Sequence, residues 1–131
     1  MGMTRRKLRE KTFELLFRAD FYDDDGKLEQ QQLFLAEHED EEEFREVAER
    51  YESILPRLPE IDAKINERTE GWKTSRMGKV ELTILRLAVY EIRYDDDVPA
   101  GVAINEAVEL AKKFGPDSAA SFVNGILAKF A

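Results

Sequence analysis

The sequence predicts an all-α fold, a compact bundle of about seven helices. Apolar residues recur at intervals of three and four along most of the chain, and alternating runs typical of strands are missing. The 131 residues suit a single domain, residues 1–131, which buries roughly two-thirds of its unfolded surface. Met1 and Gly2 precede a second methionine and are expected to be a remnant of expression.

The two C-terminal segments, 102–115 and 118–130, give the clearest helical signal. The first ends in a glycine-proline pair, a usual stop for a helix, and the second opens at Asp117 or Ser118, either of which suits a cap. Neither short helix can bury its apolar stripe alone. We therefore expect a helical hairpin around which the core closes.

Asn124 and Gly125 interrupt this pattern. Asn-Gly is ordinarily a turn dipeptide, yet the apolar period continues through it. A glycine inside a helix costs about 1 kcal/mol relative to alanine. Two explanations stand at this point: another helix packs closely against Gly125, or a binding partner approaches the backbone there and Asn124 offers its amide.

Residues 4–21 are expected to form the first helix, with cations gathered in its first turns. Residues 1–18 hold six basic and two acidic residues, whereas residues 19–70 hold six basic and eighteen acidic ones, and the chain as a whole carries a net charge of −8. Cations at a helix N-terminus oppose the helix dipole. They indicate either a merely solvated terminus or a patch that contacts phosphates on an otherwise acidic protein.

The acidic segment 23–26 is predicted to be a solvated loop, followed by a short helix over 28–36. It does not match a calcium-binding loop, because its acids are contiguous and Gln32 stands where that loop needs a glutamate. The side chains expected on one face of the helix are Leu28, Gln32, Leu35 and Ala36.

The third helix is expected to run from a cap at Asp40, with Glu43 completing a capping box, to its end at Pro56. A fourth helix over 59–69 opens at a proline and stops at Gly71. The apolar residues of these two helices are Phe44, Val47, Ala48, Tyr51, Ile54, Leu55, Ile61 and Ile65.

The fifth helix is predicted over residues 77–94, after a connector at 72–76. Its apolar face is wide, which indicates a central helix surrounded by others. A loop at 95–99 then leads to the C-terminal hairpin.

The sequence offers no site for catalysis, a metal or a cofactor. Cysteine is absent, which excludes thiolate ligands and nucleophiles and fits a reducing compartment, so a bacterial cytoplasmic protein is expected. His38 stands alone in an acidic region and cannot form a two-histidine zinc motif. Glycine-rich phosphate loops, secretory signals and apolar runs near 18 residues are also missing.

Four stretches in order nevertheless resemble the NusB family of bacterial transcription antitermination factors. They are residues 5–10 (RRKLRE), 85–91 (LRLAVYE), 98–112 (VPAGVAINEAVELAK) and 122–127 (FVNGIL). The likeness spans almost the whole chain and is most specific in the C-terminal half, while residues 20–70 match only in helical pattern.

This resemblance implies two packed three-helix subdomains plus one further helix. It also implies a non-enzymatic factor that pairs with NusE, a small-subunit ribosomal protein. The pair binds the single-stranded boxA element of nascent ribosomal or phage RNA and acts with RNA polymerase in an antitermination complex. Some family members form homodimers that hide the RNA face, so both monomer and homodimer stay open.

The resemblance also implies site residues. The arginine-rich start of the family maps onto Arg5, Arg6, Lys7 and Arg9 as contacts to RNA phosphates, and the Phe-Val-Asn-Gly motif maps onto Phe122 and Asn124. The region where the family meets NusE maps onto Glu81, with Arg76 and Arg86 nearby.

Two other classes of function remain as alternatives. A similar helical domain precedes the catalytic domain of ribosomal RNA cytosine methyltransferases, and this chain would then be a truncated piece of such an enzyme. A helical adaptor that binds protein only is the other alternative.

Overall fold

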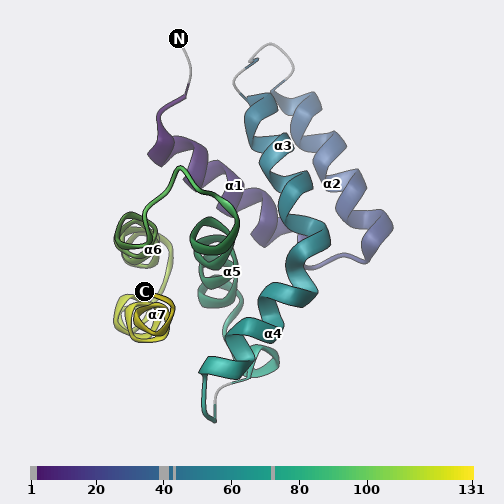
Figure 1. The fold of residues 1–131 in the computed structure, drawn as a ribbon. Coiled ribbons are helices and arrows are strands. Elements are labelled where there is room, and N and C mark those ends of the chain that lie inside the picture. Colours follow the sequence, from purple (N-terminus) through teal and green to yellow (C-terminus); the bar gives the residue numbers. More distant parts are fainter. Residues whose placement is uncertain (1–2, 39–41, 43, 72) are drawn as a thin grey trace. The chain divides into compact units, whose positions relative to one another are not determined.

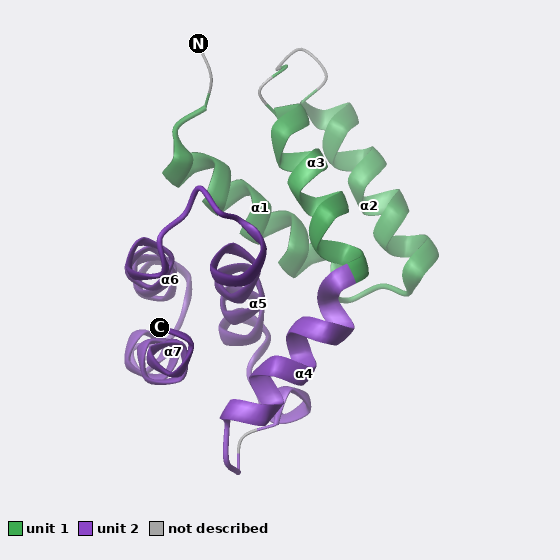
Figure 2. Ribbon diagram, in the orientation of Figure 1, with its two compact units in different colours: residues 1–56 green, residues 57–131 purple. Residues whose placement is uncertain are grey.

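A computed structural model describes residues 3–38, 42, 44–71 and 73–131, and regular structure in these residues is entirely helical. In the described part of the chain, seven α-helices and three short 3-10 helices follow one another (Figure 1). The chain divides into two compact units, residues 1–56 with three α-helices and residues 57–131 with four (Figure 2). The predicted all-α class and the number of helices are confirmed; the single domain remains a prediction.

Unit 1 is built from α1 (Arg5–Ala19), α2 (Asp24–Glu37) and α3 (Phe44–Ile54), and α1 packs against both of the others. Thr4 caps α1, because its hydroxyl accepts a hydrogen bond of 3.1 Å from the backbone N–H of Lys7. The buried face of α1 repeats at helical spacing and comprises Leu8, Arg9, Thr12, Phe13, Leu15, Leu16 and Ala19.

The α2 helix begins earlier than the sequence predicted, and the loop expected over 23–26 is wrong. Asp23 is the N-cap, accepting a 2.9 Å hydrogen bond from the backbone N–H of Gly26, and Asp24 and Asp25 lie in the first turn. Carboxylates there complement the positive end of the helix dipole. The acidic segment that the sequence predicted to be a solvated turn therefore forms the start of α2.

The buried face of α2 also differs from the expected one. It presents Gln30, Gln31 and Phe34 to the interior, while Leu28 is 56 % exposed. Burial of the two amides is tolerated because each has a partner: Gln30 accepts from Arg18 Nε at 2.6 Å, and Gln31 donates to Glu52. Apolar periodicity alone does not reveal such pairs.

The α3 helix buries most of the face that the sequence predicted, and Phe44, Val47, Ala48, Tyr51 and Ile54 are all inaccessible or nearly so. Leu55, also expected on this face, lies after the end of α3 and is half-buried. The predicted capping box of Asp40 and Glu43 lies outside the described residues.

Tyr51 should make unit 1 sensitive to alkali. Its hydroxyl donates a 3.0 Å hydrogen bond to the carbonyl of Lys27, and burial raises its pKa from 10.0 to about 12, with Arg18 acting in the opposite direction. Because the pKa of Tyr51 is higher in the folded than in the unfolded chain, the neutral hydroxyl contributes to the free energy of unfolding. This contribution is complete below pH 10, and the free energy of unfolding falls by about 2 kcal/mol as the pH rises towards 12. Urea unfolding of wild type and Tyr51→Phe should show a shallower alkaline loss in the variant. An equal loss in both would contradict this assignment.

Unit 2 contains α4 (Leu58–Arg68), α5 (Lys79–Tyr94), α6 (Ala100–Phe114) and α7 (Ala119–Leu127). The α5 helix contacts the other three, and α6 packs extensively on α7. The central helix and the C-terminal hairpin expected from the sequence are therefore confirmed. The 3-10 helices are η1 (Leu55–Arg57) between α3 and α4, η2 (Thr74–Arg76) before α5 and η3 (Ala128–Phe130) after α7.

Two glycines mark the turns of unit 2. Gly71 follows α4 with φ of +80°, a conformation that other residues rarely adopt. Gly115 ends α6, and a Cβ there would lie 2.7 Å from Cβ of Ala119, so the close corner between α6 and α7 requires a glycine. Trp72, which was assigned to the connector, lies outside the described residues.

Candidate nucleic-acid interface

The first turn of α1 carries three exposed cations, Arg5, Arg6 and Lys7, which we call the N-terminal patch. Acidic residues are absent from this turn. Arg5 lies 3.6 Å from the carboxylate of Glu46, and the ammonium of Lys7 lies 5.6 Å from the ring centre of Phe44. Because the Arg5–Glu46 pair is largely exposed, it is weak and leaves Arg5 able to exchange its partner.

Arg9 does not belong to this patch. Its side chain is only 8 % exposed, and it lies on the buried face of α1. The sequence predicted four phosphate contacts here, but the structure presents three cations to solvent. The reason is helical geometry, because Arg9 lies beside Leu8 on the buried face of α1. A count of cations in the sequence does not show which face each of them occupies.

The outer face of α7 holds Asn124 and Gly125, both exposed, with Phe122 half-buried beside them; we call these three residues the α7 surface. Val123, Ile126 and Leu127 of the same helix are buried and fix its orientation in unit 2. Beyond its chain neighbours and its own helix backbone, a Cβ added to Gly125 would meet no atom of the described residues within 4 Å. Among these residues no neighbouring helix packs against this glycine, so the first of the two explanations for it is wrong.

The three residues expected to meet a protein partner differ in their surroundings. Arg76 is exposed in η2. Glu81 is half-buried and folds over the start of α5, where its Oε2 lies 2.6 Å from the position of a Cβ on Gly78. Arg86 is paired within the chain: its Nε and Nη2 donate to the two carboxylate oxygens of Asp62 at 2.8 and 2.7 Å.

The Arg86–Asp62 pair joins α5 to α4. The side chains are only 14 % and 23 % exposed, so the pair is shielded from water. The sequence analysis did not identify Asp62, which lies 24 residues before Arg86 in the chain. The available signal was its position next to the buried Ile61 on a predicted helix.

Removing one partner of this pair should destabilise unit 2. Arg86→Leu leaves the carboxylate of Asp62 unpaired in a largely buried position, and we expect a loss of about 2 kcal/mol in the free energy of unfolding. The double variant Asp62→Leu/Arg86→Leu should recover most of that loss, because no charge is then left without its partner. Urea denaturation of the three proteins measures both effects, and single and double variants of equal stability would contradict the pairing.

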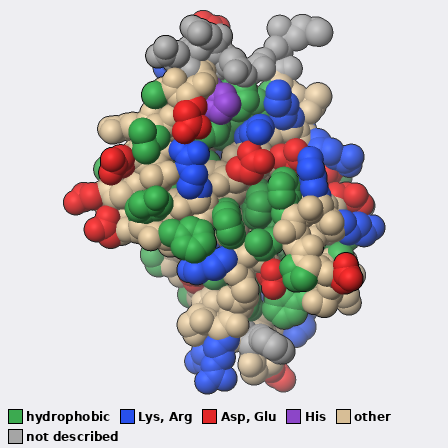
Figure 3. All heavy atoms as spheres, turned by 180° about the vertical axis from the view of Figure 1, so that it is seen from behind, with side chains coloured by type: hydrophobic (Ala, Val, Ile, Leu, Met, Phe, Trp, Pro, Cys, Tyr) green, Lys and Arg blue, Asp and Glu red, His purple; other side chains and the backbone are tan. Residues whose placement is uncertain are grey.

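His38, the lone histidine, lies in an aromatic stack. Its ring is parallel to that of Phe44, with 4.0 Å between ring centres, and it also contacts Phe34. The histidine is visible on the face of the molecule in Figure 3, where basic and acidic side chains interleave around hydrophobic ones. Among the described residues, the side chains that could ligate a metal form no cluster, and no helix is long and apolar enough to cross a membrane.

Helical units that expose a compact group of cations and an open helix face are typical of small nucleic-acid-binding proteins. Comparison with known proteins identifies the family within this class of nucleic-acid-binding proteins. The chain belongs to the NusB family, whose model matches residues 6–131.

Relatives and solved structures agree with this assignment. The transcription antitermination protein NusB of Agathobacter rectalis is 51 % identical over 131 residues, which span 98 % of this chain and 100 % of that protein. The protein of the same name from Lachnoclostridium phytofermentans is 52 % identical over 132 residues, spanning 97 % and 98 %.

Among solved structures, NusB of T. maritima superposes with a TM-score of 0.84 at 33 % identity, covering 100 % of this chain and 92 % of that one. A chain in a crystal structure described as that of a plectonemic RNA supercoil superposes with a TM-score of 0.78 at 26 % identity, covering 96 % and 92 %. The resemblance found in the sequence is thus confirmed, and these relatives favour it over the methyltransferase alternative.

Proposed function

We propose that the chain binds boxA-type single-stranded RNA together with the ribosomal protein NusE during ribosomal RNA transcription. As a member of the NusB family it is a transcription antitermination protein, a non-enzymatic RNA-binding factor. Its place of action in this proposal is the bacterial cytoplasm, within the RNA polymerase antitermination complex.

The observation that carries the RNA part of the proposal is the N-terminal patch. Three exposed cations share one helical turn in a chain whose net charge is −8. An acidic protein resists nonspecific coating by nucleic acid, so its affinity must come from a local patch. Phosphates of a single strand supply the opposite charge. One structural neighbour comes from a crystal structure described by its RNA, which agrees with this proposal.

The α7 surface supplies the second part. Single strands are held by cations along the phosphates together with planar groups that stack on bases. Phe122 offers a ring and Asn124 an amide that can both donate and accept hydrogen bonds. Gly125, with open space beside it, lets a sugar or base approach the helix backbone closely.

The partner NusE follows from the small size of the patch. Three cations hold a single strand weakly, and affinity that rests on phosphates falls steeply with salt. A basic partner would enlarge the cationic surface and would be attracted to the acidic chain. We assign Arg76 and Glu81 to this contact, while Arg86 supports it by holding α5 against α4 through Asp62.

A titration with boxA-like RNA tests the proposal, using the chain alone and with NusE at several salt concentrations. We expect weak, salt-sensitive binding by the chain alone, and tighter binding with NusE that a scrambled RNA of equal length does not reproduce. Equal affinity for both RNAs in the presence of NusE would overturn the proposal.

A further inference from the structure

Unit 2 contains a second group of cations that the sequence did not reveal. Phe130, in η3, is 3 % exposed, and its ring contacts two guanidinium groups. The guanidinium carbon of Arg68, at the end of α4, lies 4.6 Å from the ring centre, and that of Arg93, in the last turn of α5, lies 5.4 Å away. One buried ring therefore gathers cations from two helices that are distant in sequence.

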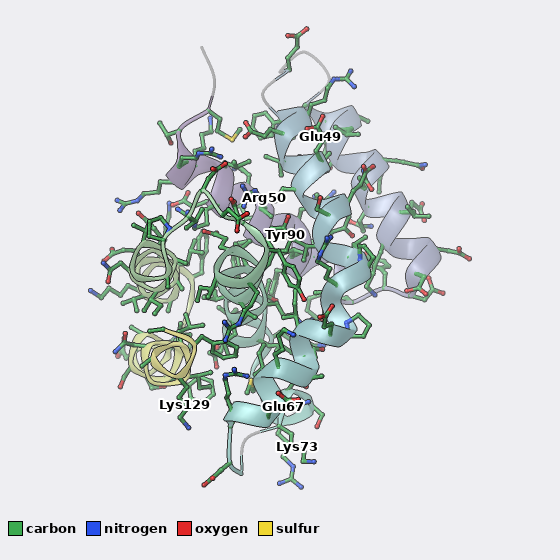
Figure 4. All side chains as sticks on the ribbon, in the orientation of Figure 1. Glu49, Arg50, Glu67, Lys73, Tyr90 and Lys129 are labelled. Carbon is green, nitrogen blue, oxygen red and sulfur yellow. The ribbon has the colours of Figure 1, made fainter. Side chains whose placement is uncertain are left out.

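Lys129 adds a third cation. Its ammonium donates a 2.9 Å hydrogen bond to the carbonyl of Arg68, which places it at the C-terminal end of α4 (Figure 4). We call Arg68, Arg93 and Lys129 the Phe130 cluster. Stacking on the ring and the bond to the carbonyl restrict these long side chains, so less rotamer entropy is lost when they bind an anion.

Among the described residues, acidic side chains offset little of the charge of this cluster. Glu67 lies 3.8 Å from Arg68, but its side chain is 72 % exposed, and such a pair contributes little. Arg93 and Lys129 are both exposed. Packing on Phe130 positions Arg68 and Arg93, and the bond to the carbonyl of Arg68 positions Lys129. Because Arg93 and Lys129 remain exposed, both can meet an anion from solvent.

We propose that the Phe130 cluster binds phosphates of the RNA backbone without reading its sequence. This inference rests on the proposed function and adds a second contact in unit 2. An acidic protein segment is a poorer occupant, because protein interfaces are centred on apolar anchors. Among the described residues of unit 2, the exposed large hydrophobic side chain is Val102 of α6, which belongs to none of the elements that form the cluster. A surface made of guanidinium and ammonium groups without an apolar anchor suits phosphates.

The test compares wild type with Arg93→Gln/Lys129→Gln, both exposed positions, while Arg68 stays in place to cover the ring. The probe is a boxA-like RNA extended at both ends, titrated with the chain and NusE across a range of salt. Loss of two single-strand phosphate contacts should reduce the slope of log affinity against log salt by about 1.4. Thermal unfolding confirms that the variant is folded, and Arg93→Glu/Lys129→Glu should enlarge the effect.

Lys64→Ala is the matched control, because Lys64 lies one turn before Arg68 and its ammonium is paired with Glu60 at 3.3 Å. Its slope should equal that of wild type. An unchanged slope in both Arg93/Lys129 variants would overturn the cluster as an RNA contact, while sequence-selective binding by wild type in the same assay keeps the proposed function intact. Loss of NusE affinity with unchanged RNA affinity would instead assign the cluster to the protein partner, and would also overturn the inference.

Discussion

Replacing Arg5, Arg6 and Lys7 by glutamine reduces the salt slope of RNA binding by about 2, since each single-strand phosphate contact contributes roughly 0.7. When salt is raised from 50 to 200 mM, the factor by which RNA affinity falls is then about 20 times smaller for the variant than for wild type. The slope is the informative quantity, because it counts phosphate contacts, whereas affinity also includes bases and NusE. Adding Arg9→Gln should leave the slope unchanged and lower stability instead, because Arg9 is buried.

The matched control neutralises three other cations, Lys11, Lys27 and Lys64, and changes the net charge by the same amount. Lys11 is paired with Glu14 at 3.1 Å and Lys64 with Glu60, while Lys27 donates to the carbonyl of Tyr22. If both triple variants lose the same slope, RNA senses only the net charge of the chain, and the N-terminal patch has no specific role.

Gly125→Ala is expected to increase stability and weaken RNA binding together. Gly125 lies inside α7, its φ is not positive, and an added methyl group meets no atom within 4 Å, so the free energy of unfolding should rise by about 1 kcal/mol. In the proposed complex, the same methyl group would occupy the space through which RNA reaches the backbone. We expect several-fold weaker binding to boxA RNA, and a larger loss for Gly125→Leu. A helix position that keeps a destabilising residue without a packing reason is typical of a functional site.

Gly101→Ala provides the control for this pair of effects. Gly101 is exposed in the first turn of α6, and a Cβ there also meets nothing within 4 Å. Its substitution should leave RNA affinity unchanged. If Gly125→Leu binds boxA RNA as tightly as wild type, the α7 surface does not contact RNA.

Periodicity predicted most of the fold because burial in a helical bundle repeats every three to four residues. Most of the buried face of α3, the wide apolar face of α5 and the presence of the C-terminal hairpin follow from this. The prediction failed at α2, where Asp23 caps a helix and paired glutamines replace apolar residues on the inner face. Hydrogen-bond partners decide such positions, and those partners lie elsewhere in the chain.

The candidate site was predictable only in part, for the same reason. Counting charges identified the first turn of α1, but it did not separate the exposed Lys7 from the buried Arg9 two residues later. Arg86 was expected to face a partner, yet it is held by Asp62. Charge in a sequence shows which side chains are present, and tertiary contacts decide which of them are available.

Ultraviolet cross-linking of boxA RNA to the chain in complex with NusE, mapped by mass spectrometry, shows whether the RNA lies against the α7 surface. We expect cross-links at Phe122 on α7, and we expect them to fade when the N-terminal patch is neutralised. Phe21 and Tyr22, which are 61 % and 47 % exposed, serve as internal references, because aromatic rings there would react if RNA lay against them. Cross-links confined to Phe21 and Tyr22, with none at Phe122, would show that RNA does not bind the α7 surface.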